Sequence, residues 1–232
     1  FSSAIGGLDA LIDAIRSLVA TGRLPPPFMN PTSGINMVGG KVAIATGATG
    51  PIASVITACA TGSSSLILGA MLIAQGMADV AICGAVDFPL VESIVAGFAT
   101  MNGAYRPKDG EEPPPPQAAS CPFSAFRRGF VVSEGAGCVV IASRAFADAH
   151  GLSYAIELAG WGMTADAFHV VAPNPVTVRR CIGESLTHAG IDPGDIDAVS
   201  AHAASTKIGD RVEADALREV FGVGIPPVSA AK

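Results

Sequence analysis

The sequence is poor in charged residues. Only 15% of its 232 residues are Asp, Glu, Lys or Arg, whereas 50% are hydrophobic. A disordered chain needs the opposite balance, because low hydrophobicity and dense charge prevent it from burying a core. The chain is also long enough to bury one sizeable core or two small ones. The composition therefore indicates a soluble globular protein.

Basic residues are few and form no cluster. The sequence has 14 Lys and Arg against 20 Asp and Glu, which gives a net charge of -6 at pH 7. Binding to phosphate backbones needs a concentrated basic surface. We therefore expect no nucleic-acid partner.

The five cysteines form no C-x-x-C pair. Neither a zinc ribbon nor a disulfide framework is indicated, and we expect no metal site. Free thiols are typical of a reducing compartment, so we expect a cytoplasmic location. Cys83, Cys138 and Cys181 lie within apolar runs and are predicted to be packing residues.

No charged residue occurs between Lys41 and Asp79, which is a feature of membrane spans. Three glycines and a proline divide this stretch into short pieces, however (Gly47, Gly50, Pro51 and Gly62). The longest unbroken piece, 62–78, is apolar on nearly every side and predicts a helix buried inside a soluble protein. We expect no membrane segment. We also expect no signal peptide, because the chain opens without a basic region, and its start without Met suggests a processed or excised piece.

The periodicity of apolar residues predicts an α/β chain. Helices are expected over 8–21, 182–189 and 212–221, and strands over 52–58, 80–86, 129–143 and 197–201. The order strand, helix, strand over 52–86 indicates a βαβ unit with a parallel sheet. Segment 24–31 holds four prolines and predicts an extended loop, and 41–46 fits either a strand or a buried helix.

Residues 106–122 contain four consecutive prolines with charged neighbours. This composition predicts an exposed loop of polyproline type. Two interpretations remain open for it: a solvated connector, or a docking site for a proline-reading partner.

Cys59 is the leading candidate for a nucleophile. It lies where the predicted strand 52–58 ends and the apolar helix begins, among small residues that would let a substrate approach. The unpaired N–H groups of a helix N-terminus favour a thiolate and can bind an oxyanion. A buried structural cysteine is the alternative.

A cysteine nucleophile needs a base or hydrogen-bond donor near it in space. His150 and His188 stand at helix ends before Gly, where a cation complements the dipole, and His169 is ambiguous. His202 follows the predicted strand 197–201 among small residues. Ligands bind at that end of strands in open α/β sheets, so His202 is a catalytic candidate.

Segment 57–63, Thr-Ala-Cys-Ala-Thr-Gly-Ser, resembles the nucleophile segment of the β-ketoacyl-acyl carrier protein synthases, the condensing enzymes of fatty-acid and polyketide assembly. Segment 127–137 resembles the Arg-Asp-Gly-Phe…Gly-Glu-Gly-Ala-Gly segment of that family. Further similar segments follow in the family's order, so the resemblance runs essentially from end to end (78–85, 165–169, 201–202, 209–213 and 228–232).

The resemblance implies a thiolase-like fold, a layered αβαβα body, of which this chain covers the middle part. It implies an incomplete β-ketoacyl synthase domain over 1–232, with 1–140 as the end of the N-terminal half and 141–232 as the start of the C-terminal half. It also implies a homodimer, or a heterodimer with another ketosynthase. The family's second catalytic histidine would follow Lys232, so we expect only part of an active site in the chain.

The implied activity is a decarboxylative Claisen condensation of an acyl thioester on Cys59 with malonyl on an acyl carrier protein, in fatty-acid or polyketide biosynthesis. His202 and Lys232 would complete the catalytic set in this chain, with Glu213 as a supporting carboxylate. No metal or free cofactor is implied, because phosphopantetheine on the carrier protein holds the substrates. Its arm would bind at Thr206, Ser205 and His169. A local patch of Arg106, Arg127 and Arg128 would suit an acidic carrier protein.

The chain departs from the family after His202, where Ala203-Ala204 replaces Gly-Thr. The first threonine hydroxyl of the family is therefore lost, and the extra methyl of Ala203 is expected to crowd the backbone. This departure keeps open a non-catalytic partner subunit of the chain-length-factor type, although such subunits typically lack the cysteine that is present here. A thiolase or an acyl-CoA hydrolase on the same fold is a third, less favoured interpretation.

Overall fold

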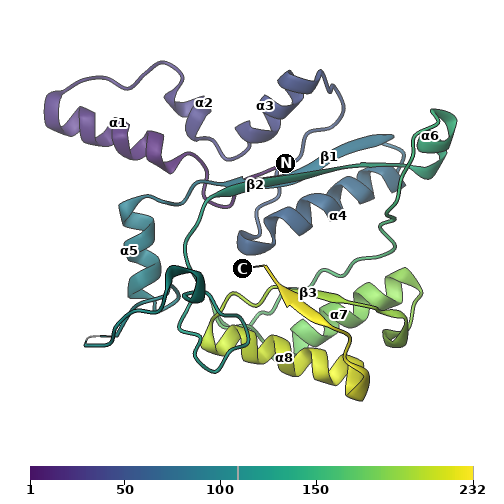
Figure 1. Ribbon diagram of the computed structural model, residues 1–232. Coiled ribbons are helices and arrows are strands. Elements are labelled where there is room, and N and C mark those ends of the chain that lie inside the picture. The colour runs from purple at the N-terminus through teal and green to yellow at the C-terminus, as the bar shows by residue number, and fades with distance from the viewer. Residues whose placement is uncertain (109, 232) are drawn as a thin grey trace. The chain divides into compact units, whose positions relative to one another are not determined.

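The computed structural model describes residues 1–108 and 110–231, and the chain divides into two compact units. Unit 1 comprises Phe1–Ile94 and Ser133–Ile156, and unit 2 comprises Val95–Val132 and Glu157–Lys232. Both units combine helices and strands (Figure 1).

Unit 1 contains an antiparallel pair of strands with a helix on one face. Its helices are α1 (Leu8–Thr21), α2 (Met29–Ser33), α3 (Met37–Thr46), α4 (Thr61–Ala74) and α6 (Arg144–Ala149), and α5 (Glu92–Thr100) starts in this unit and ends in unit 2. A 3-10 turn, η1 (Ala58–Ala60), precedes α4, and the strands are β1 (Val80–Asp87) and β2 (Gly135–Ala142).

Helix α4 packs on the sheet that β1 and β2 form (Figure 1). The strands run antiparallel, with Val80 opposite Ala142 and Asp87 opposite Gly135. Gly69 makes the close approach possible, because a Cβ at this position would overlap the Sγ of Cys83. Near the start of the helix, Ser65 Oγ accepts the Gly84 N–H at 3.0 Å. Helix α4 is therefore held against β1 by both packing and a buried hydrogen bond.

The predicted buried helix over 62–78 is confirmed as α4, although it ends earlier. The last helical residue is Ala74, and Gly76 at φ +67° donates its N–H back to the Ile73 carbonyl. Only one face of the helix is buried, since Met71 is 47% exposed. Gly76 thus stops the helix inside an apolar run that hydropathy alone would extend.

The prediction of a strand over 52–58 is wrong, and so is the parallel βαβ unit built on it. The segment before η1 is irregular and largely exposed, and β1 pairs antiparallel with β2 instead. A run of β-branched residues becomes a strand only where another strand supplies hydrogen-bond partners. Here the Thr57 N–H donates to Thr61 Oγ1, so this end of the segment is committed to the turn before α4.

Other predictions in unit 1 had mixed outcomes. The helix over 8–21 is confirmed as α1, which ends at Gly22 in the left-handed conformation (φ +68°). The undecided segment 41–46 belongs to helix α3, and the predicted loop 24–31 turns helical at Met29, where α2 begins. Cys83 is a core residue as predicted, but Cys138 is exposed on β2.

Unit 2 builds a small parallel sheet beside two long helices. Its elements are the turn η2 (Pro116–Ala118), α7 (Pro175–Ala189), η3 (Pro193–Asp195), β3 (Val199–Ala201), α8 (Lys207–Phe221), η4 (Gly222–Gly224) and β4 (Val228–Ala230). β3 and β4 are parallel, with Ser200 opposite Ser229, and α7 packs against α8 (Figure 1). Two predicted helices are confirmed as parts of longer ones: 182–189 lies in α7 and 212–221 lies in α8. The predicted strand over 197–201 is confirmed as β3, which is shorter.

Across residues 1–108 and 110–231, none of the helices combines the length and the hydrophobicity needed to cross a membrane.

We expect Gly69→Ala to destabilise the protein, because the new methyl group would overlap the Cys83 side chain in a packed interface. The expected loss in the free energy of unfolding is about 1–3 kcal/mol, measured by urea denaturation. The matched control is Gly183→Ala on α7, where a new Cβ meets nothing within 4 Å. That change should stabilise the protein by about 0.5–1 kcal/mol. Equal effects at the two positions would contradict the packing described for α4.

Candidate active site

Cys59 lies in a tight turn at the start of α4. The turn depends on Ala58, which has φ +49°, a left-handed conformation that costs a non-glycine residue about 1–3 kcal/mol. Two hydrogen bonds hold the turn: the Thr57 N–H donates to Thr61 Oγ1 at 3.0 Å, and the hydroxyls of Thr57 and Ser64 are 2.7 Å apart. The cysteine itself is exposed. A strained backbone therefore presents an accessible thiol beside a helix N-terminus.

This geometry suits a nucleophile better than the other cysteine beside α4. The 14-residue helix directs its first N–H groups, and the positive end of its dipole, toward the turn that holds Cys59. Cys83 on β1 is 2% exposed, and burial raises the pKa of its thiol. Burial and a raised pKa both oppose thiolate chemistry, so Cys83 serves packing.

His202 follows the end of β3, and a carboxylate fixes its backbone. Glu213 on α8 accepts the His202 N–H through Oε1 at 2.8 Å and the Ala203 N–H through Oε2 at 2.7 Å. Ala203 is 1% exposed, so its methyl group is accommodated in the interior. His202 is exposed. Glu213 thus supports the histidine through the main chain.

The next residues form the N-terminal cap of α8. Thr206 is the N-cap, and its Oγ1 accepts the Gly209 N–H at 3.2 Å. Ser205 has φ +64° and is fully buried, and its Oγ accepts the Cys121 N–H at 3.1 Å. The Ser205 hydroxyl therefore faces the protein interior, whereas Thr206 is only half-buried.

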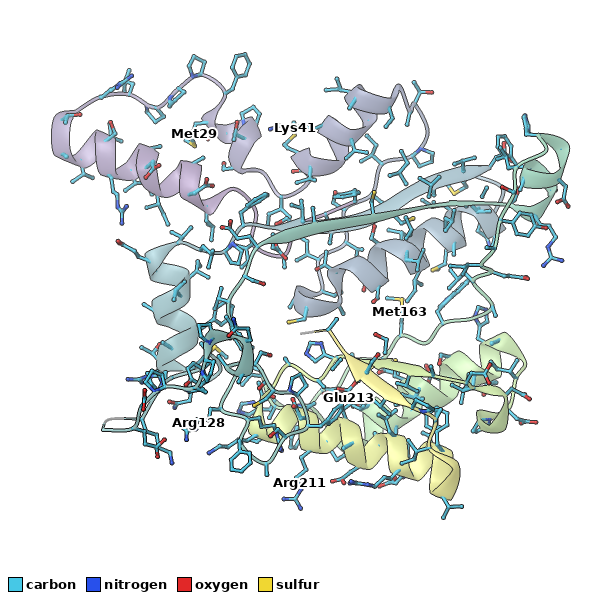
Figure 2. All side chains as sticks on the ribbon, in the orientation of Figure 1. Met29, Lys41, Arg128, Met163, Arg211 and Glu213 are labelled. Atoms are coloured by element: carbon cyan, nitrogen blue, oxygen red, sulfur yellow. The ribbon has the colours of Figure 1, made fainter. Side chains whose placement is uncertain are left out.

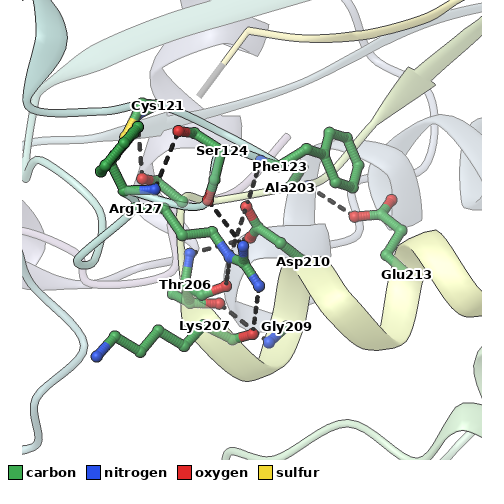
Figure 3. Close-up of polar contacts among 12 residues, drawn as sticks. Cys121, Phe123, Ser124, Arg127, Ala203, Thr206, Lys207, Gly209, Asp210 and Glu213 are labelled. Atoms are coloured by element: carbon green, nitrogen blue, oxygen red, sulfur yellow. Dashed lines mark hydrogen bonds and ion pairs between the residues drawn. The ribbon is translucent and has the colours of Figure 1, made fainter.

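The structure reveals a charged cluster that the sequence does not predict (Figure 3). The Asp210 side chain is 1% exposed, and its carboxylate accepts the Thr206 N–H at 2.9 Å and the Phe123 N–H at 2.8 Å. Arg127 Nε lies 3.7 Å from this carboxylate. The two charged residues belong to motifs that the sequence displays, but nothing in their spacing indicates that they meet.

The expected basic patch of Arg106, Arg127 and Arg128 is not formed as predicted. The Arg127 side chain is only 18% exposed and is directed at backbone carbonyls. Arg128 donates to Glu111 at 2.6 Å, and that bond, with a second from Lys108, lowers the pKa of the Glu111 carboxyl. Two of the three guanidinium groups are therefore engaged within unit 2.

The other histidines have local hydrogen-bonding roles. His169 Nδ1 accepts the N–H groups of Val171 and Ala172, both at 3.1 Å, so its proton is on Nε2. His188, in the last turn of α7, accepts the Trp161 N–H, and His150 forms the C-cap of α6. The positions predicted for His150 and His188 at helix ends are confirmed.

The structure gathers several of the expected site residues in unit 2. His202, Ser205 and Thr206 follow one another before α8, and Glu213 on that helix reaches back to the first of them. Cys59 belongs to unit 1. Lys232 lies outside the described residues. Among the residues that the structure describes, no group of three or more His, Cys, Asp or Glu side chains could hold a metal ion.

Relatives of known class match nearly the whole chain. The 3-oxoacyl-[acyl-carrier-protein] synthase 2 of Rhizobium meliloti (strain 1021) is 38% identical over 223 residues, which cover 95% of this chain and 52% of that protein. The synthase of the same name from Staphylococcus aureus is 36% identical and covers 95% of this chain and 54% of its own length. The chain thus spans about half the length of these relatives.

Solved ketosynthases share the fold. A type II polyketide ketosynthase, solved in complex with its acyl-carrier protein, is 27% identical with a TM-score of 0.92 and covers 99% of this chain and 58% of its own. The ishigamide ketosynthase/chain length factor is 29% identical with a TM-score of 0.87 and covers 99% and 55%. These similarities confirm the expected thiolase-like fold.

Two family models account for most of the sequence. The beta-ketoacyl synthase N-terminal domain matches residues 8–147. The C-terminal domain of the same family matches residues 155–232. This chain therefore belongs to the beta-ketoacyl synthase family.

Proposed function

We propose that the protein forms carbon–carbon bonds by decarboxylative Claisen condensation, as a 3-oxoacyl-[acyl carrier protein] synthase type of acyltransferase in fatty-acid or polyketide biosynthesis. The observation that carries this proposal is the exposed Cys59 in its strained turn at the start of α4. Membership of a family whose relatives are named 3-oxoacyl-[acyl-carrier-protein] synthases supports it.

In the first half-reaction, the Cys59 thiolate attacks the carbonyl carbon of an acyl thioester. The tetrahedral oxyanion that forms needs hydrogen-bond donors, which backbone N–H groups at the turn before α4 can supply. Collapse of this intermediate breaks the bond to the pantetheine sulfur. The acyl group then remains on Cys59, and the carrier leaves as a thiol.

In the second half-reaction, a malonyl thioester loses carbon dioxide to give an enolate. The His202 imidazole donates a hydrogen bond to the enolate oxygen, which lowers the barrier to decarboxylation. The enolate carbon attacks the acyl carbonyl on Cys59 and expels the thiolate. The product is a 3-oxoacyl thioester two carbons longer, and the thiolate is regenerated.

Supporting roles fall to residues around these two groups. Glu213 positions His202 through the backbone, and Lys232 orders the catalytic histidines through its charge. The half-buried Thr206 binds the pantetheine arm, and so does His169. The family resemblance also implies that Ser205 binds the arm. Its complete burial and its bond to Cys121 support a role beneath Thr206 instead.

The proposed activity also implies a partner, an oligomeric state and a location. The partner is an acyl carrier protein, whose phosphopantetheine holds the substrates, so the reaction needs no resident cofactor. We assign residues up to roughly 140 to the end of the N-terminal half of the domain and the rest, to 232, to the start of the C-terminal half. Two successive family models support a division into two halves, since one ends at residue 147 and the other begins at residue 155. A homodimer, or a heterodimer with another ketosynthase, in the cytoplasm is the expected form.

A second candidate function is a non-catalytic subunit of the chain-length-factor type. Ala203-Ala204 favours it, because this pair removes a hydroxyl that the family usually places after the histidine. One solved structure similar to this chain is named a ketosynthase/chain length factor. The two candidates differ in whether Cys59 accepts an acyl group.

We expect an acyl carrier protein thioester to acylate Cys59 at least about tenfold faster than the matching acyl-CoA, because carrier contacts add binding energy in the transition state. Intact-mass spectrometry after incubation with each donor measures the added acyl group. Cys59→Ala is the control for the site, and Cys138→Ala is the control for an exposed cysteine of no proposed role. Equal labelling of Cys59→Ala and the unmodified protein would exclude the site. Absence of labelling with either donor would favour the non-catalytic subunit.

We expect Glu213→Gln to destabilise the segment that carries His202. Both carboxylate oxygens accept backbone N–H groups, and an amide would turn its own NH₂ toward one of them. The free energy of unfolding should fall by about 1–3 kcal/mol, because a neutral amide accepts more weakly than a carboxylate and leaves one backbone N–H without its acceptor. The rate of malonyl decarboxylation should fall with it.

The matched control for this variant is Glu184→Gln. Glu184 is exposed on α7 and pairs with Arg180 one helical turn away at 3.3 Å. Loss of an exposed pair of this kind costs about 0.5 kcal/mol or less. A Glu213 variant that behaves like the Glu184 variant would contradict the positioning role of Glu213.

A further inference from the structure

We infer that Arg127 is a positioning residue for the pantetheine arm and acts by fixing Thr206, an inference that rests on the proposed function. Arg127 comes from the segment that follows the proline loop and not from α8, where Thr206 is the N-cap. Two of its three guanidinium nitrogens nonetheless donate to backbone carbonyls at the start of that helix (Figure 3).

The contacts of Arg127 use its whole planar fork. Nε donates to the Thr206 carbonyl at 3.0 Å, one terminal nitrogen donates to the Lys207 carbonyl at 2.8 Å, and the other donates to the Ser124 carbonyl at 2.8 Å. Only an arginine offers donors in three fixed directions within one plane. The side chain therefore ties the 124–127 turn to the first two residues of the cap.

The position of this charge is not explained by helix stability. A cation beside a helix N-terminus faces the positive end of the helix dipole, which is unfavourable. Asp210, in the first turn of α8, offsets that cost with its carboxylate 3.7 Å from Nε. The ion pair also fixes the position of Thr206, because Asp210 accepts the Thr206 N–H. Asp210 thus accepts the N–H of Thr206, and Arg127 donates to its carbonyl, so both backbone groups of Thr206 are fixed.

With its backbone fixed, Thr206 can present its hydroxyl group to a ligand in one orientation. Its Oγ1 accepts the Gly209 N–H, so the hydroxyl proton remains to be donated outward. A donor in this place selects an acceptor, and the amide carbonyls of a pantetheine arm are acceptors. Arg127 would therefore act on recognition of the arm without touching it.

The test compares a donor that has these amides with one that lacks them. Acyl transfer to Cys59 is followed by intact mass with an acyl-pantetheine thioester and with the S-ethyl thioester of the same acid. In Arg127→Lys, the charge next to Asp210 is retained while the three-way fork is lost. We expect kcat/KM for the pantetheine donor to fall about tenfold, as for the loss of about one hydrogen bond, and that for the S-ethyl donor to stay within about twofold.

The matched control is Arg211→Lys, the same substitution on an exposed residue of α8. Arg211 points away from β3, on the side of the helix opposite Glu213 (Figure 2), and its side chain is 80% exposed. Arg211→Lys should leave kcat/KM unchanged with both donors. A second measurement is a double-mutant cycle, in which Thr206→Val and Arg127→Lys together should cost no more than Thr206→Val alone.

Three results would overturn the inference without touching the proposed function. An equal loss with both donors in a folded Arg127→Lys protein would show a merely structural role, and no loss with either donor would show no role. Additive effects in the cycle would show that Arg127 does not act through Thr206. If the unmodified protein accepts acyl groups from neither donor, the proposed function itself fails, and this inference with it.

Discussion

A carboxylate in a protein interior has to be matched by donors and by a cation, because removal of a charge from water costs several kcal/mol. Asp210 is such a group, at 1% exposure, and the architecture around the candidate site in unit 2 follows from satisfying it. Its partners are the Thr206 N–H, the Phe123 N–H and the Arg127 guanidinium. These partners join the segment after the proline loop to the N-terminus of α8. The helix so anchored then supplies Glu213, whose carboxylate holds the backbone of His202.

In unit 1, the backbone around Cys59 is held by a strained turn and hydroxyl groups, and not by a buried charge. The left-handed Ala58 turns the chain abruptly before α4, and hydroxyl groups of Thr57, Thr61 and Ser64 hold that turn. The helix is in turn locked to β1 by Ser65 and by the close approach at Gly69. An exposed thiol with a fixed backbone is the outcome. In both units, then, the side chain proposed to react is exposed while hydrogen bonds hold its main chain, an arrangement that suits preorganised catalysis.

Local patterns in the sequence were sufficient for elements that depend on neighbours in the chain. Helix α1 was predicted over its full length, because its apolar periodicity ends at a glycine that takes the left-handed conformation. The strand over 52–58 failed for the opposite reason, since strand formation depends on a distant partner that composition does not reveal. Cys59 and His202 could be singled out as candidates by their small neighbours and by their place after predicted strands. The contact between Arg127 and the start of α8 could not be predicted in this way, because Arg127 and Thr206 are 79 positions apart in the sequence.

We propose that the protein joins an acyl group on Cys59 to a decarboxylated malonyl unit. The most direct test of this proposal is a single-turnover reaction of the acylated protein with malonyl thioester labelled with carbon-13 at its central carbon. We predict a 3-oxoacyl thioester that contains the labelled carbon, one carbon dioxide released per product, and loss of both in His202→Ala. Recovery of the acyl group as free acid, with the labelled carbon in no new carbon–carbon bond, would contradict it.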